Sequence, residues 1–205
     1  ENVDVNRAQA DGMTALHWAV YHEDAALVRR LLGAGAQVDS QNRYSVTPLS
    51  IACMSGNETL VQRLVDAGAD PNAGLRGGET VLMTAARTGK LGAVKVLLAH
   101  GAKVEAKERK GQTALMWAAA EGHAAVVEAL LEAGADFRVS LNSGFTAFFF
   151  AVREGRIDVV RTLIRAGVDV NEGMTSGKRA TRPLILAVQN GHFELAMVLL
   201  EAGAE

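Results

Sequence analysis

The sequence predicts an all-α protein, a solenoid built from stacked pairs of short helices. Two markers that recur along the chain with one common step support this prediction. The first is a six-residue stretch that returns every 33 residues, as TALHWA, TPLSIA, TVLMTA, TALMWA and TAFFFA, with its threonine at positions 14, 47, 80, 113 and 146. The second is the glycine of segments such as LLGAGA, at positions 35, 68, 101, 134, 167 and 203.

The six-residue marker predicts the first helix of each unit. Threonine is a good helix N-cap, and the Ala or Pro that usually follows it suits the first helical turn. The Leu and Ala that follow, three residues apart, give the helix an apolar face with a small contact point. This helix should be only about two turns long.

A second helix and a loop complete each unit. The glycines at positions 56, 89, 122, 155 and 191 permit the left-handed residue that ends the first helix. Segments such as AAVVEALLEA then repeat apolar residues at helical spacing, which predicts a second helix running antiparallel to the first. About ten polar residues, such as DPNAGLRGGE, carry the turn signals of a hairpin-like connection to the next threonine.

One such unit cannot cover its own apolar face, so neighbouring units must stack on one another. The pattern Thr-x-Leu-x-x-Ala, the Gly-His pairs at 122–123 and 191–192 and the Leu-Leu-x-x-Gly-Ala segments resemble the ankyrin repeat. The resemblance implies an ankyrin-repeat solenoid of about six helix-turn-helix units, curved, with loops projecting along one edge. Its concave side would be lined by those loops and by the first helices. Two of the units also resemble ankyrin-repeat proteins of environmental bacteria.

The markers divide the chain into one ankyrin-repeat domain spanning residues 1–205. We expect units at about 12–44, 45–77, 78–110, 111–143, 144–179 and 180–205, with residues 1–11 as the tail of a preceding unit of a longer array. The sixth copy begins at Arg182, 36 residues after Thr146, and Arg182 replaces the capping threonine. The three extra residues lie within NEGMTSGKRATR and should change one loop while leaving the stack intact.

Composition restricts the possible functions. The formal net charge of −2 does not mark the chain as a binder of nucleic acids or membrane surfaces. The single cysteine excludes an internal disulfide framework, and no apolar run approaches the length of a membrane span. We expect a soluble piece with the cytoplasm as the default compartment, although a longer precursor could carry an export signal.

No catalytic, cofactor or metal site is expected, and the chain is not expected to be an enzyme. The histidines lack partners at metal-ligand spacing, and Cys53, inside a first helix, should be buried and inert. The segment GMTSGKR has three residues between its glycines where a phosphate-binding loop needs four, and Arg179 stands where Ser or Thr should bind magnesium.

The loop tips carry the most informative residues, because stacking does not dictate them. At the 33-residue step Arg43, Arg76 and Arg109 share one register, a ladder spanning about 20 Å if units stack about 10 Å apart. Further candidates beside this ladder are Tyr44, Lys110, Arg87, Arg153 and, in the longer loop, Lys178 and Arg179. The alternative is that these are solvated charges paired with neighbours such as Glu79, Glu108, Glu121 and Glu154.

Aromatic residues lie near the same surface. Trp18, Trp117 and Phe150 share the fifth place of Thr-x-Leu-x-x-Ala, and Tyr21 and Phe145 lie close by in sequence. Aromatic residues beside arginines are typical of protein-binding hot spots. Packing within the stack is the alternative role for the two tryptophans.

These observations favour a non-catalytic scaffold that binds another macromolecule, most simply an acidic protein segment, through the concave groove and loop tips. The alternatives are a structural spacer, or a segment of a longer array that self-associates through its open ends. A third alternative is an enzyme or regulator whose catalytic part lies outside these residues. Nucleic acid is an unlikely partner on a chain of this charge.

Overall fold

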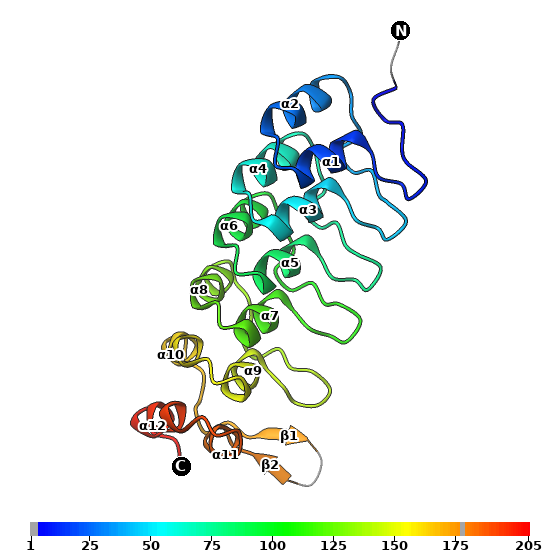
Figure 1. Ribbon diagram of the computed structural model, residues 1–205. Coiled ribbons are helices and arrows are strands. Elements are labelled where there is room, and N and C mark those ends of the chain that lie inside the picture. Colours follow the sequence, from blue (N-terminus) through cyan, green and yellow to red (C-terminus); the bar gives the residue numbers. More distant parts are fainter. Residues whose placement is uncertain (1–3, 177–178) are drawn as a thin grey trace.

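The computed structural model describes residues 4–176 and 179–205 and shows an elongated stack of helix pairs, with the two termini at opposite ends (Figure 1). Twelve helices are present within the described residues. The first helices of the units are α1 (Ala15–Tyr21), α3 (Pro48–Ser55), α5 (Val81–Arg87), α7 (Ala114–Glu121), α9 (Ala147–Arg153) and α11 (Pro183–Gln189). The second helices are α2 (Ala25–Gly33), α4 (Glu58–Asp66), α6 (Leu91–Ala99), α8 (Ala124–Glu132), α10 (Ile157–Arg165) and α12 (Phe193–Glu201).

The helices form two layers, and the loops form a third edge. The second helices make the outer layer, the first helices lie beside them, and the loops project from the far side of the first helices (Figure 1). First helices pack on first helices of adjoining units, and each packs on its own second helix. Leucines and small residues such as Ala52, Ala86 and Ala119 are fully buried between the layers. The predicted all-α solenoid is confirmed.

The predicted threonine caps explain where the first helices begin. The hydroxyl oxygens of Thr47, Thr80, Thr113 and Thr146 each accept a hydrogen bond from the backbone N–H three residues later, at 3.1–3.4 Å. Thr14 differs, because its hydroxyl is 2.8 Å from Nδ1 of His17 instead. Four of the five predicted caps therefore act through the backbone, which satisfies an otherwise orphaned N–H at the helix start.

A left-handed residue follows each first helix, as predicted. The five glycines at positions 56, 89, 122, 155 and 191 have φ between 68° and 89°. The first unit has Glu23 at the equivalent place, with φ of 55°. In the loops Ser45 is likewise left-handed, with φ of 61°, where the neighbouring units place Gly12 and Gly78. Glu23 and Ser45 thus have a left-handed backbone conformation, which costs about 1–2 kcal/mol for a residue with a Cβ.

Hydrogen bonds between units fix their spacing. The His123 ring nitrogen Nε2 lies 3.0 Å from the carbonyl oxygen of Arg87, and Nε2 of His192 lies 2.8 Å from that of Arg153. In the unit between them, Nε of Arg156 donates to the carbonyl oxygen of Ala120 at 2.9 Å. Each bond runs from the start of a second helix to the last turn of the first helix in the preceding unit. The Gly-His histidines thus connect neighbouring units.

The three-residue insertion changes one loop and leaves the stack intact. It contributes to an antiparallel hairpin of β1 (Met174–Ser176) and β2 (Arg179–Thr181), where the other loops have at most isolated bridges. The following helix α11 still packs on α9. Arg182 makes no side-chain cap, and Pro183 occupies the first helical position. The predicted basic residue Lys178 lies outside the described residues, and the side chain of Arg179 is not among those described.

Candidate functional site

The loop tips present the three arginines that the sequence placed in one register, Arg43, Arg76 and Arg109, which we call the tip arginines. All three are exposed. Two pairs of neighbouring loops are joined through their backbones: the N–H of Arg43 donates to the carbonyl oxygen of Asp11 at 2.9 Å, and that of Arg109 donates to the carbonyl oxygen of Gly77 at 3.1 Å. The two bonds lie at equivalent positions, 66 residues apart, and connect the loop of Arg43 to the first loop and the loop of Arg109 to the loop of Arg76.

The tip arginines keep their charge available. Within residues 4–176 and 179–205, none of the three forms an ion pair. The neighbouring carboxylate of Glu108 instead accepts hydrogen bonds from the backbone N–H groups of Lys110 and Gln112, at 2.9 and 3.1 Å. The guanidinium of Arg43 lies 4.9 Å from the ring centroid of the exposed Tyr44.

Two other predicted arginines, Arg87 and Arg153, which we call the inner arginines, sit at the ends of first helices and are paired. Nη2 of Arg87 donates to Oε1 of Glu79 at 3.1 Å, and Nε of Arg153 donates to Oε1 of Glu154 at 2.8 Å. The ion-pair alternative considered from the sequence therefore applies to the inner arginines, but not to the tip arginines.

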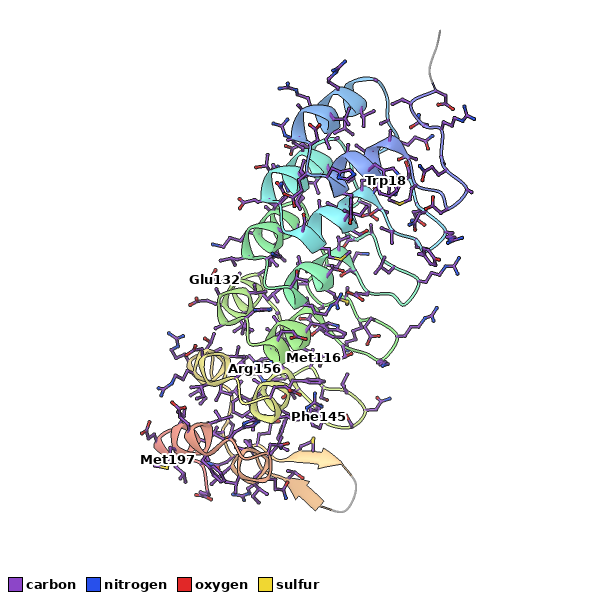
Figure 2. All side chains as sticks on the ribbon, in the orientation of Figure 1. Trp18, Met116, Glu132, Phe145, Arg156 and Met197 are labelled. Atoms are coloured by element: carbon purple, nitrogen blue, oxygen red, sulfur yellow. The ribbon has the colours of Figure 1, made fainter. Side chains whose placement is uncertain are left out.

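Aromatic rings cluster at the N-terminal end of the first-helix layer. Trp18 and Tyr21 meet edge to face with centroids 5.8 Å apart, and His22 stacks on Trp18 at 6.2 Å. Tyr21 is 62% exposed and Trp18 is 38% exposed. Figure 2 shows that Trp18, like Phe145 further along, lies on the side of the first helices that faces the loops, whereas Glu132 and Met197 lie on the outer helices.

The other two residues at the fifth place are more enclosed. Trp117 is half-buried beneath Arg87, whose guanidinium carbon lies 5.7 Å from the indole centroid. Phe150 is only 6% exposed and lies under Arg153, 5.0 Å from its guanidinium carbon. The same guanidinium lies 5.2 Å from the half-buried Phe145. These rings support the inner arginines.

Met54 is an exposed residue that the sequence pattern did not single out. Its side chain is 55% exposed at the end of α3, the place that Tyr21, Arg87 and Arg153 occupy in their own units. Aligning the units at the 33-residue step could have found it, since Met54 follows Tyr21 by one step. It extends the exposed apolar surface from the first unit into the second.

His17 and Cys53 are both buried within the stack. His17 is buried, with Nδ1 near the Thr14 hydroxyl and Nε2 3.0 Å from the carbonyl oxygen of Val46; burial lowers its pKa below 6.5, while the bond to Val46 opposes the shift. Burial raises the pKa of the Cys53 thiol to about 12. In the part of the chain that the structure describes, no three His, Cys, Asp or Glu residues are placed to hold a metal, and no helix is long and apolar enough to cross a membrane.

A hollow of about 720 Å³ lies on the outer layer between α8, α10 and α12. Its rim carries Glu128, Asp158 and Glu201 together with Arg161 and Arg165. Charges of both signs surround it, so its lining favours no ligand of one charge. On the loop edge, by contrast, the tip arginines form no ion pair within the described residues, so this surface favours a negatively charged ligand.

Comparison with known families identifies the class. A model of ankyrin repeats in three copies matches residues 1–74, 59–140, 108–174 and 136–205, which together include the whole chain. The chain belongs to the ankyrin-repeat family. Ankyrin repeats generally mediate protein–protein interaction, and the family is typically non-catalytic.

Individual relatives resemble only a short part of the chain. Potassium channel AKT1 of Arabidopsis thaliana is 42% identical over 55 residues, and AKT1 channels of Oryza sativa subsp. indica and subsp. japonica match to the same extent. The match includes 27% of this chain but only 6% of each channel. The similarity is therefore confined to a 55-residue segment, and it does not extend to the rest of those channels.

Proposed function

We propose that this chain is a non-catalytic scaffold that binds an acidic segment of another protein along its loop edge. The observation that carries the proposal is the set of tip arginines: exposed, at the same position of successive units, and without ion pairs within the described residues. Guanidinium groups bind carboxylates with two parallel N–H···O bonds, so three in a row favour an acidic segment over a neutral one.

Exposed aromatic and apolar side chains beside the ladder would supply contact area. Tyr44 lies at a loop tip, and Trp18, Tyr21 and Met54 are exposed on α1 and α3. Tyr and Trp lose little conformational entropy on binding and are common at interface centres. In the proposed groove, the arginines orient the partner and the aromatic residues desolvate it.

Selection from a displayed library of random peptides tests this proposal. Peptides enriched on the protein should be rich in Asp and Glu. The triple variant Arg43→Glu, Arg76→Glu, Arg109→Glu should lose them, because losing three exposed ion pairs weakens binding by about 3- to 150-fold before any repulsion is counted. The matched control is Arg29→Glu, Lys95→Glu, Arg161→Glu, which makes the same change of charge on the outer helices and should retain the peptides. Enrichment of neutral peptides, or equal retention by both triple variants, would refute the proposal.

End-to-end self-association is a second candidate, favoured by one observation. Ile185 and Val188 on α11 are each 48% exposed, whereas the equivalent Phe149 and Val152 are buried by the following unit. A second copy stacking on α11 would bury them. Light scattering should then show a mass that rises with protein concentration, and Ile185→Lys should abolish the rise; a constant monomer mass would exclude this candidate.

A further inference from the structure

Each inner arginine is part of a fixed group of three side chains that carries no net charge. In the first group Arg87 lies over the Trp117 ring and donates to Glu79, whose Oε1 also accepts from the Thr84 hydroxyl at 3.1 Å. In the second group Arg153 lies over Phe145 and Phe150 and donates to Glu154. We call Glu79–Arg87–Trp117 and Glu154–Arg153–Phe145 the neutral platforms.

The platforms are positioned but still open to a ligand. The side chains of Arg87 and Arg153 are 40% and 42% exposed, although ring and carboxylate hold each guanidinium in place. A guanidinium has five N–H donors, and the carboxylate takes only one in each platform. Within the described residues, the buried Nε of Arg87 and the buried Nε1 of Trp117 have no acceptor at all. These two buried atoms are out of a partner's reach, so the donors that the first platform offers are the remaining N–H groups of the partly exposed Arg87 side chain.

A neutral acceptor suits these donors better than a carboxylate does. A carboxylate brought to either platform would meet the negative charge of Glu79 or Glu154, which offsets the attraction of the guanidinium. A backbone carbonyl gains the hydrogen bond without that repulsion. The platforms and the tip arginines thus favour different parts of a partner.

Their spacing fits an extended chain. Arg87 and Arg153 are 66 residues apart, which is two steps of the repeat. Units whose helices pack about 8–10 Å apart place the platforms about 16–20 Å from each other. An extended peptide advances about 3.3 Å per residue, so five or six residues join the platforms, and its side chains point alternately to opposite sides.

We infer that the surface between the first helices and the loops takes an extended segment whose uncharged backbone lies on the two neutral platforms while alternate acidic side chains reach the tip arginines. The inference rests on the proposed function and adds to it the conformation and the sequence pattern of the partner. A segment with Glu or Asp at every second position fits, whereas a block of acidic residues leaves half of them facing away from the tip arginines.

Two capped peptides of identical composition test the inference on the unmodified protein. One alternates Glu and Ala over about twelve residues, and the other has all its Glu residues before all its Ala residues. Titrations followed by NMR chemical shifts should show that the alternating peptide binds about tenfold more tightly. Equal affinities would overturn the inference and leave the proposed function standing. If neither peptide binds, the proposed function fails as well.

Charge-conserving variants separate the platforms from the tips. Glu79→Gln with Arg87→Gln, combined with Glu154→Gln and Arg153→Gln, removes both guanidinium groups without changing the net charge. This variant should bind the alternating peptide about tenfold more weakly, with the salt dependence of binding unchanged. Arg43→Gln with Arg109→Gln should instead flatten the salt dependence. Full affinity in the platform variant, with an unchanged thermal midpoint, would overturn the inference.

Discussion

The thiol of Cys53 should be almost unreactive in the folded protein. The side chain is fully buried, and burial raises its pKa from 9.0 to about 12. Only the thiolate attacks reagents such as DTNB. A pKa three units higher lowers the thiolate fraction near pH 8 by about 1,000-fold, so the folded protein should be labelled at least about 1,000 times more slowly than the unfolded chain.

The assay compares DTNB labelling at pH 8 in native buffer and in concentrated urea. Because the reagent also needs physical access, the native rate should follow the opening of the second unit and rise steeply with sub-denaturing urea. The control is Cys53→Ala with Ser55→Cys, which moves the thiol to an exposed position of the same helix α3. That variant should be labelled rapidly without urea. Native labelling of Cys53 within about tenfold of the unfolded rate would refute the argument.

Three further predictions concern stability. Ser45→Gly should raise the free energy of unfolding by about 0.5–1 kcal/mol, because glycine adopts the left-handed backbone conformation of Ser45 without strain. Part of the gain is offset because glycine makes the unfolded chain more flexible, and a lower urea midpoint would contradict the prediction. Leu130→Ala should cost about 2–5 kcal/mol in urea melts, since its side chain is fully buried, while the exposed Glu132→Ala should change stability by less than about 0.5 kcal/mol. The pKa of His17 is lowered in the folded state, so below pH 6.5 the unfolded chain binds the proton more readily and the free energy of unfolding decreases as the pH falls. His17→Gln should remove this contribution to the pH dependence of stability, and an unchanged dependence in the variant would disprove the prediction.

Much of the fold could be predicted from the sequence because its signals are local. A threonine cap needs only the backbone N–H three residues later, and the left-handed turn needs only a glycine just after the first helix. Repetition at a fixed step then implies stacking, since no unit can bury its own apolar face. The register of Arg43, Arg76 and Arg109 on the loop tips follows from the same periodicity.

The state of the candidate binding residues depended on contacts between units. Trp18 and Trp117 share one place in the repeat, yet Trp18 meets Tyr21 and His22 of its own helix, whereas Trp117 is covered by Arg87 of the preceding unit. No spacing rule indicates that an inner arginine will be neutralised and a tip arginine will not.

The sequence by itself thus determined the repeat, the helices with their caps and the register of the loop tips, because each is encoded within a few residues or by the period. Only the tertiary structure decided which charges stay free and which rings stay exposed. Those properties depend on side chains that meet across the boundary between units, such as Arg87 over Trp117, or that lie too far apart in the sequence for a local pattern to pair them, such as Glu79 and Arg87.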